Sequence, residues 1–406
     1  MKKYNLILAI VFVKCIAFGQ IDTTLTLVSK IDAFPQFQLA DGNQIYMMGY
    51  TQLIGSPIDI PSPTLNFIEG DSVQLNMWNL SQGPPHTIHL HGLDVNQAND
   101  GVPSLSFAVP HDNTGSYYFE APHPGTYIYH CHETSVLHVQ AGMYGMLIVR
   151  PQSADTLTWE GGYSFHSENA WMMSEIDTNW HVDSIINHSY DPLAMTHEIL
   201  DYMPQHFLIN GRSEQLLTGS STELNMSVGE KVYLRLANIG NYGNKLVFPS
   251  QLNAEIIASD GRPLPLAYSS DTLVLLPGER YGVLLESSVL FNDSVEVNYF
   301  SLNTEEISNT QYVEVMAEGF LSTAEMDKKA LVVYPNPTSE TLTVNLTSSE
   351  GQAKKLRLID VLGKAVISKD YSNEQYNLDT TSLQSGTYFL EVIHEGNIYL
   401  EKIIKR

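Results

Sequence analysis

Apolar and polar residues alternate in short runs through most of the chain, and few stretches repeat with a helical period. Gly, Pro, Asn and Asp separate the runs, and these residues favour turns. An alternation with a period of two puts successive side chains on opposite faces of a strand. The pattern therefore predicts an all-β protein made of sandwich-type domains.

An internal repeat divides these predicted strands into two related domains. The stretch LNFIEGDSVQLNMWN (65–79) aligns without gaps on LNMSVGEKVYLRLAN (224–238), at an offset of 159 residues. Gly70 falls on Gly229, and Asn79 falls on Asn238. Because this offset is the size of one β-sandwich with its loops, we expect one sandwich at residues 20–152 and a related one at 153–322.

The first residues, MKKYNLILAIVFVKCIAFGQ, run from a basic start through an apolar core to a small-residue end. This pattern predicts a cleaved signal peptide at residues 1–19. Its removal takes away Cys15 and leaves Cys131 as the sole cysteine, which cannot form an internal disulfide. No later stretch reaches the roughly 18 apolar residues that span a bilayer, so we expect no membrane insertion.

Charge separates the end of the chain from its body. Residues 20–327 hold 8 basic and 36 acidic residues, a net charge of −28, whereas residues 328–406 hold 10 basic and 9 acidic residues. The break predicts a domain boundary near residue 327. The stretch of low hydrophobicity LSTAEMDKKA (321–330) predicts a linker at 323–330, and the strand-like runs with turn residues between them predict a small C-terminal β-sandwich at 331–406. An acidic body repels nucleic acid and anionic membranes, and favours cationic or neutral partners.

Two segments of the first domain are rich in metal-binding side chains: HTIHLH (86–91) and YIYHCHETSVLHVQAGMYG (127–145). In the register of the repeat, the first segment falls on KLVFPS (245–250), so the fold itself does not require the histidines. Residues 207–393 contain neither histidine nor cysteine. We therefore expect a metal site in the first sandwich and none in the second.

Strand parity divides the candidate ligands into two sets. His89 and His91 point to one face of a strand and His86 to the other, and Cys131 points away from the histidines on either side of it. The predicted interior set is His86, Cys131, His138 and Met143, with Met146 as the alternative to Met143. Two imidazoles, a thiolate and a weak axial thioether are the ligands of a blue (type 1) copper site. Zinc also accepts Cys and His, but usually in closed sites without methionine.

The predicted outer set is His89, His91, His130 and His132. Four neutral imidazoles on one face suit copper or zinc. Cys131 is peptide-bonded to His130 and His132, so an electron on the interior metal needs to cross only one residue to reach the outer set. A single histidine on a strand is more often structural than metal-binding, and His111 and His123, which fit neither set, are expected in loops.

These motifs resemble those of the multicopper oxidases, a family of cupredoxin-fold proteins. HTIHLHGLDVNQANDGVP (86–103) and GTYIYHCHETSVLHVQAGMYGMLIV (125–149) resemble its two histidine motifs, while FLINGRS and LPGERYGVLLE are similar to its copper-free middle domain. The resemblance implies two cupredoxin-like Greek-key β-sandwiches with copper as cofactor. It assigns the interior set to type 1 copper, His89 to type 2 copper, and His91, His130 and His132 to type 3 copper.

The histidine count departs from the family pattern. Members that reduce dioxygen use eight histidines, four from each of two facing domains, whereas this chain supplies one set of four. We hypothesise that two copies of the first domain pool their histidines across a symmetric contact, which predicts a homo-oligomer. The other candidate contributors are His166, His181, His188, His197 and His206, although EIDTNWH (175–181) is more typical of a packing feature.

The C-terminal region resembles the sorting domain of type IX secretion cargo. The matching features are Tyr334-Pro335-Asn336-Pro337, Gly363-Lys364, Leu383, Gly386-Thr387-Tyr388 and the basic end KIIKR. This resemblance implies export across an outer membrane to the cell surface or medium, with the type IX secretion machinery as partner. The alternative is an ordinary adhesion-type β module.

Together these features predict a secreted, laccase-type copper oxidoreductase. A small-molecule reductant would be oxidised in one-electron steps at the type 1 copper, and dioxygen reduced at the histidine-bound cluster, with Cys131, His130 and His132 carrying the electrons. Two alternatives remain: a copper nitrite reductase-like enzyme with a single type 2 copper, and a non-catalytic type 1 copper carrier or copper-binding module. Histidines on both sides of Cys131 favour the oxidase, and the missing second set of four weakens it.

Overall fold

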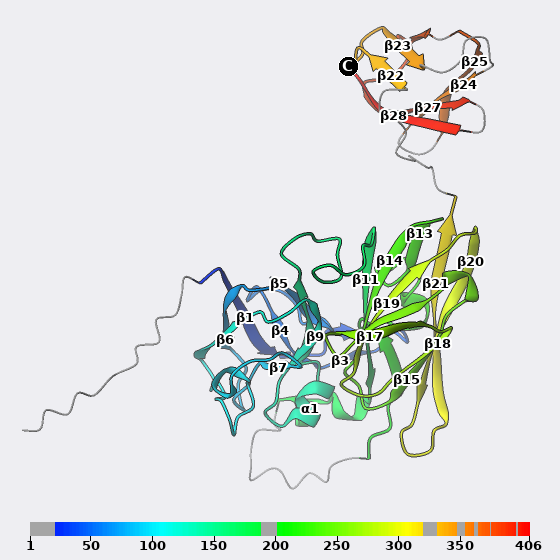
Figure 1. Ribbon diagram of the computed structural model, residues 1–406. Coiled ribbons are helices and arrows are strands. Elements are labelled where there is room, and N and C mark those ends of the chain that lie inside the picture. Colours follow the sequence, from blue (N-terminus) through cyan, green and yellow to red (C-terminus); the bar gives the residue numbers. More distant parts are fainter. Residues whose placement is uncertain are drawn as a thin grey trace, which may run out of the picture. The chain divides into compact units, whose positions relative to one another are not determined.

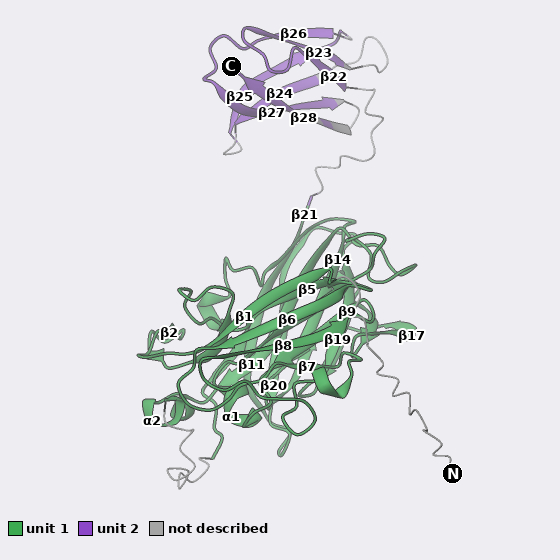
Figure 2. Cartoon of the chain, turned by 90° about the vertical axis from the view of Figure 1, so that its left-hand side faces the viewer, with its two compact units in different colours: residues 1–318 green, residues 319–406 purple. Residues whose placement is uncertain are grey.

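The computed structural model describes residues 21–187, 201–319, 331–346, 354–360, 364–373, 375–394 and 397–406. Within these residues the protein consists mostly of strands, which confirms the all-β prediction. The chain forms two compact units, residues 1–318 and 319–406 (Figure 2). The predicted signal peptide and the predicted linker at 323–330 lie outside the described residues.

The first sandwich consists of two four-stranded sheets (Figure 1). The strands of one sheet, in spatial order, are β4 (Met48–Thr51), β1 (Thr23–Ile31), β6 (Ser72–Asn79) and β8 (Asn113–Glu120). Those of the other are β5 (Ser62–Ile68), β10 (Tyr144–Arg150), β9 (Gly125–His130) and β7 (His89–His91). Three further elements complete this part of the chain: the β2–β3 pair (Phe37–Gln38, Gln44–Ile45), η1 (Gln97–Asn99) and α1 (Ser135–Gln140).

Alternation along the strands builds the core of this sandwich. On β6, Val73, Leu75 and Met77 are buried, and the residues between them are only partly buried. The buried side chains pack in one cluster with others from both sheets, Leu65 and Tyr117 among them. Cys131 and Met143 belong to the same cluster, so the predicted interior ligands lie in the core between the sheets.

The second sandwich pairs a six-stranded sheet with a five-stranded one. The first has the order β12 (His206–Ile209), β11 (Ser167–Ile176), β14 (Lys231–Asn238), β19 (Arg280–Glu286), β16 (Glu255–Ser259) and β17 (Arg262–Ser269). The second has the order β13 (Leu224–Ser227), β21 (Ile307–Glu318), β20 (Phe291–Phe300), β15 (Gly243–Val247) and β18 (Thr272–Leu275). Its short helices are η2 (Thr178–Trp180), α2 (Asp183–Ile186), η3 (Glu214–Leu216) and η4 (Ser250–Leu252).

The sequence repeat corresponds to equivalent structural elements, β5–β6 in the first sandwich and β13–β14 in the second. Gly70 and Gly229 occupy the two connecting turns with the same positive φ of 85°, a conformation that favours glycine. Asn79 and Asn238 end the two strands, and the side-chain oxygen of each accepts a hydrogen bond of 2.9 Å from the backbone N–H two residues later. The repeat therefore preserves local turn geometry as well as apolar positions.

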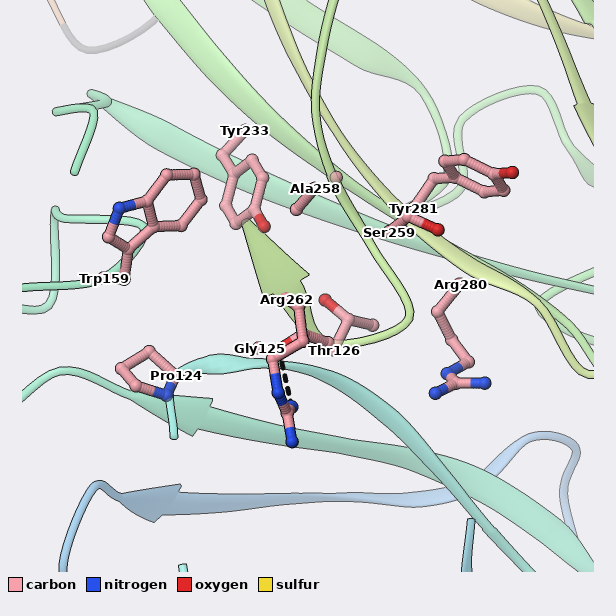
Figure 3. A pocket seen from close by; sticks show the side chains of 12 residues that line it. Pro124, Gly125, Thr126, Trp159, Tyr233, Ala258, Ser259, Arg262, Arg280 and Tyr281 are labelled. Carbon is pink, nitrogen blue, oxygen red and sulfur yellow. Dashed lines mark hydrogen bonds between the residues drawn. The ribbon is translucent and has the colours of Figure 1, made fainter. Parts of the chain in front are cut away.

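The two sandwiches share a packed seam within the first unit. Ile128 and Met146 of the first sandwich join Met172 and Leu208 of the second in one buried cluster. Figure 3 shows a small cavity in this seam, bounded by Pro124, Gly125 and Thr126 on one side and by residues of the second sandwich on the other. Its volume is about 10 Å³, which holds about one water molecule. This cavity is therefore too small to hold an organic substrate.

The C-terminal unit is a small sandwich of two sheets. One sheet has the order β22 (Leu331–Tyr334), β23 (Thr341–Leu346) and β26 (Gln375–Asp379). The other has the order β25 (Ala365–Tyr371), β24 (Lys354–Asp360), β27 (Gly386–His394) and β28 (Asn397–Lys405). Asn336, within the predicted Tyr334–Pro337 motif, forms two hydrogen bonds to the backbone of β28. Its Nδ2 donates to the Lys402 carbonyl at 2.6 Å, and its Oδ1 accepts from the Ile404 N–H at 2.9 Å. Gly363 lies outside the described residues. Among those described, no helix has the length and apolar character that crossing a bilayer requires.

Candidate metal centre

Neighbouring strands bring the two histidine-rich segments together. β7 pairs with β9 in antiparallel register, with His89 opposite His130. Cys131 and His132 directly follow β9, and His138 lies on α1, which is next to β7 and β9 in Figure 1. The local fold thus places every predicted ligand at one end of the first sandwich.

The interior set gathers around the sulfur of Cys131. The Nδ1 atom of His138 lies 3.2 Å from Sγ, and the Nδ1 atom of His86 lies 3.7 Å from it. All three residues are buried, and their ligand atoms lie within 4.8 Å of one another. Bonds of about 2.0–2.3 Å to a single ion put three trigonal ligands roughly 3.5–4 Å apart. The spacing therefore suits one metal ion bound between the two rings and the thiolate.

Packing distinguishes the two methionines considered as the axial ligand. Met143 is fully buried in the same core cluster as Cys131, whereas Met146 belongs to the cluster in the seam. Two backbone hydrogen bonds hold Met143 beside the other members of the interior set. The Met143 N–H donates to the His138 carbonyl at 2.9 Å, and the Cys131 N–H donates to the Met143 carbonyl at 3.0 Å. The surroundings of Cys131 therefore favour Met143.

The four histidines of the outer set form one cluster. The ring of His89 lies with its centroid 5.1 Å from those of both His130 and His132, and the rings of His91 and His130 are 5.5 Å apart. The closest nitrogens are His91 Nδ1 and His130 Nε2, at 3.3 Å. His89, His91 and His130 have ligand atoms within 4.8 Å of one another.

Backbone carbonyls fix which nitrogen of two outer rings can bind metal. The carbonyl oxygen of Asp100 accepts a hydrogen bond from His89 Nδ1 at 2.7 Å, and that of Cys131 accepts one from His130 Nδ1 at 3.0 Å. Each bond places the proton on Nδ1 and leaves Nε2 free as a ligand. Metal-bound histidines typically have their second nitrogen held in this way, so the outer cluster has the arrangement of a metal site.

Burial keeps the clustered imidazoles neutral. It lowers the pKa of His138 to about 4, of His130 to about 3 and of His91 to about 4, the last also because of the positive charge of Arg280. Burial also raises the pKa of the Cys131 thiol to about 11. Neutral imidazole and thiolate are the forms that bind metal. These three histidines are therefore neutral at pH 7, while metal binding must displace the thiol proton.

The remaining described histidines of the first unit belong to neither cluster. His111 and His123 lie outside the strands, as predicted, with ring nitrogens near the Ser81 carbonyl and the Asp94 carboxylate. His181 is buried and bonds the Tyr46 carbonyl at 2.8 Å, which agrees with a packing role. A ring nitrogen of His166 accepts from the Lys231 N–H, and a ring nitrogen of His206 lies near the Asp41 carboxylate. His188 and His197 lie outside the described residues.

Several residues that sequence reasoning did not identify support the ligands. Thr87, which lies between the two sets on the first segment, accepts a hydrogen bond from the His132 N–H at 2.8 Å, and its hydroxyl lies 3.9 Å from Cys131 Sγ. Tyr50 donates to the Thr87 carbonyl. In the alternation of HTIHLH, Thr87 falls on the same face as His89 and His91, so this pattern does not mark it as a neighbour of Cys131. No local pattern marks Tyr50 either.

The donor set fits copper. Two imidazoles and a thiol buried beside a thioether are the ligands of a type 1 copper site, whereas structural zinc sites rarely include methionine. The second cluster consists of imidazoles only, and two of its members, His130 and His132, are the chain neighbours of Cys131; it is also suitable for copper. Fold and site together define a copper protein built of cupredoxin-like sandwiches.

Family comparison gives the more specific class. Residues 40–154 and 178–319 each match a sequence model described as multicopper oxidase, and together these segments include most of the first unit. The chain belongs to the multicopper oxidase family, and its cofactor is copper. Residues 332–406 match a secretion system C-terminal sorting domain, which agrees with the tail motifs.

Curated relatives of the chain include oxidoreductases and copper resistance proteins. The chain is 26% identical over 245 residues to oxidoreductase OpS5 of Beauveria bassiana and 34% identical over 124 residues to copper resistance protein A of Escherichia coli. These matches cover 59% and 30% of this chain but only 40% and 19% of the relatives.

Two solved structures from Nitrosomonas europaea share the fold. A blue copper oxidase matches with a TM-score of 0.56 at 23% identity, covering 72% of this chain and 86% of that one. A copper nitrite reductase matches with a TM-score of 0.53 at 17% identity, covering 73% and 94%. At these identities the two matches establish the fold alone.

Proposed function

We propose that this protein is a copper-dependent oxidoreductase that oxidises a small-molecule reductant and reduces dioxygen. His86, Cys131, His138 and Met143 would hold a type 1 copper, and His89, His91, His130 and His132 would hold type 2 and type 3 copper. When bound, copper supplies one-electron redox chemistry. The observation that carries the proposal is the pair of histidine clusters on either side of Cys131, with ligand atoms at metal-binding spacing.

The chain's own residues provide the connection between the two sites. Cys131 contributes its sulfur to the inner cluster, and its peptide bonds lead directly to His130 and His132 of the outer cluster. His130 Nδ1 also donates a hydrogen bond to the Cys131 carbonyl at 3.0 Å, which adds a second connection between Cys131 and the outer cluster. Thr87 holds the backbone of His132 in place. An electron would therefore cross one residue, through covalent bonds, inside a closely packed core.

The outer cluster needs a partner if it is to reach the eight histidines expected of a dioxygen-reducing family member. The side chain of His89 is 17% exposed, and His132 is half-buried. The cluster is therefore accessible on the side of these two residues. We propose that a second copy of the chain approaches there and completes the cluster across a symmetric contact.

A copper nitrite reductase-like enzyme is the second candidate. The observation that favours it is the compact group of His89, His91 and His130, whose three ligand atoms suffice for a single type 2 copper. Such an enzyme would use the same inner site for electron entry. A non-catalytic carrier would use only the inner site, and would leave the ordered outer cluster without a role.

Copper per chain, the mass of the assembly in solution and the consumed oxidant separate these candidates. More than two coppers per chain in an oligomer that consumes dioxygen would support the oxidase. Two coppers per chain with nitrite as the consumed oxidant would support the reductase, and one copper with neither activity would support the carrier. An active oxidase that is a monomer would rule out the pooled cluster.

The C-terminal unit would direct the enzyme out of the cell. The match of residues 332–406 to a sorting domain supports export through the type IX secretion machinery to the cell surface or medium. Fusing this segment to a reporter in a bacterium that has this machinery tests the proposal. Secretion of the fusion supports it, and retention of the fusion inside the cell contradicts it.

A further inference from the structure

The turn between β18 and β19 of the second sandwich, residues 276–279, reaches the outer histidine cluster. Two backbone hydrogen bonds to Asn238 fix the turn. The Gly278 N–H donates to the Asn238 carbonyl at 2.8 Å, and the Asn238 N–H donates to the Glu279 carbonyl at 3.0 Å. The Glu279 side chain closes the turn by accepting from the Leu276 N–H at 2.7 Å. Asn238 is fully buried. The turn is therefore held rigidly by the sheet from which it projects.

Gly278 lies directly against the ring of His91. A Cβ atom at Gly278 would lie 3.2 Å from His91 Cε1 and 3.5 Å from Nε2, and the backbone has a positive φ of 84°. Cε1 is bonded to both ring nitrogens, and the other nitrogen, Nδ1, lies 3.3 Å from His130 Nε2. The second sandwich therefore contacts the edge of the ring formed by Cε1 and Nε2.

Arg280 fastens this turn to the first sandwich. Its Nη1 donates to the Gly278 carbonyl and pairs with Asp260 at 3.0 Å. Its Nη2 fills the space beside Gly92, the residue after His91, where a Cβ atom would lie only 2.1 Å away. Figure 3 shows the Arg280 side chain extending from the second sandwich toward the first. Arg280 is 5% exposed, and its Nε has no hydrogen-bond partner.

Burial of the Arg280 guanidinium costs folding free energy. A buried guanidinium with an unpaired N–H loses hydration that the protein does not fully replace. Of the eight basic residues among positions 20–327, this one lies next to the histidine cluster and braces the glycine that touches it. The contacts thus join a ligand ring to the rigid frame of the other domain.

We propose that Gly278 and Arg280 are positioning residues of the outer metal site, and that the copper-free sandwich forms one wall of that site. Gly278 provides the surface against which the His91 ring rests, and Arg280 holds the Gly278 carbonyl and spans the seam to Gly92. The inference rests on the proposed function, because it takes the outer histidines as metal ligands. It gives the second sandwich a part in the metal site although that sandwich contributes no ligand.

Two substitutions with matched controls separate this role from general stability. Gly278→Ala adds a methyl group against His91, whereas Gly229→Ala, at nearly the same φ of 85° in the same sandwich, adds one where nothing lies within 4 Å. Arg280→Lys keeps the charge but loses the guanidinium fork. Arg262→Lys is its control, because Arg262 also spans the seam, to Tyr127 and Asp94, away from the histidines.

The experiment measures copper retained per chain by the full-length protein against increasing concentrations of a chelator. The blue absorption of the inner site is recorded in the same samples. We expect Gly278→Ala and Arg280→Lys to weaken outer copper binding by about 10- to 100-fold, the effect typical of second-shell changes. The blue absorption should match wild type, and both controls should retain wild-type outer copper.

Three results would overturn the inference. Outer copper retained as well by Gly278→Ala and Arg280→Lys as by their controls would remove the positioning role. A parallel loss of inner copper in these variants would show a general structural effect instead. A wild-type protein without copper beyond the inner site would overturn the proposed function and this inference together, so that this failure is distinct from the first.

Discussion

Glu175 on β11 should make stability depend on pH, and the size of the effect follows from its surroundings. The side chain is buried next to the seam, where Oε1 accepts hydrogen bonds from Tyr202 and from the backbone of Asn241 and Tyr242. Oε2 has no partner. Burial outweighs these hydrogen bonds and raises the pKa of Glu175 from 4.5 to about 7. Its backbone carbonyl accepts from Gln140 at 2.8 Å, at the end of the helix that carries His138.

The sign and magnitude follow from proton binding. Below pH 4.5 the carboxyl is protonated in both the folded and the unfolded protein. Between pH 4.5 and 7 the unfolded chain loses this proton while the folded chain keeps it, so the free energy of unfolding falls as pH rises. Each pH unit in this window costs about 1.4 kcal/mol, which gives a loss of about 3 kcal/mol before the curve levels off above pH 7.

Urea unfolding of wild type and Glu175→Gln, at a series of pH values from 4 to 8, tests this prediction. The glutamine keeps an uncharged side chain of the same shape, so subtracting the two curves isolates the titration of Glu175. Wild type should lose about 3 kcal/mol relative to the variant between pH 4.5 and 7. A difference that stays constant with pH, or that grows in favour of wild type, would refute the reasoning.

Three further predictions concern the inner site and the core. Cys131→Ser should abolish the blue absorption and electron transfer while circular dichroism stays close to wild type, because the two side chains are similar in size; a serine variant that remains blue would refute the assignment. Met143→Leu should raise the reduction potential of the inner copper, since a weak axial donor is lost, whereas Met146→Leu should leave it unchanged; equal shifts in a redox titration would contradict this. Leu75→Ala and Leu234→Ala, both fully buried at equivalent positions of the repeat, should each cost about 2–5 kcal/mol in urea unfolding, and losses well under 1 kcal/mol would show that the core relaxes around them.

The separation of ligands into two sets could be predicted from the sequence because it depends on local covalent geometry. Successive residues of a strand face opposite sides, so the spacing of His86, His89 and His91 alone divides inner from outer positions. The structure groups His86 with Cys131 and His138, and groups His89 and His91 with His130. The choice of Met143 over Met146 was less certain from sequence, and it gained support only from the packing of the two core clusters.

The supporting residues could not be predicted, because their roles arise from contacts between distant segments. Gly278 and Arg280 lie more than 180 residues from His91 in the chain, and their approach depends on how the two sandwiches pack. The carbonyl of Asp100 has no side-chain signature, although it holds the His89 ring. The repeat predicted a second sandwich without a metal site, and it gave no sign that one of the turns of that sandwich would lie against His91.

A crystal structure of the copper-loaded protein with anomalous diffraction at the copper edge tests the central claim most directly. We expect one peak within about 2.3 Å of His86 Nδ1, Cys131 Sγ and His138 Nδ1, and further copper density among the outer histidines. A copper-loaded crystal with no peak beside Cys131, or with copper bound only elsewhere on the chain, would contradict the account.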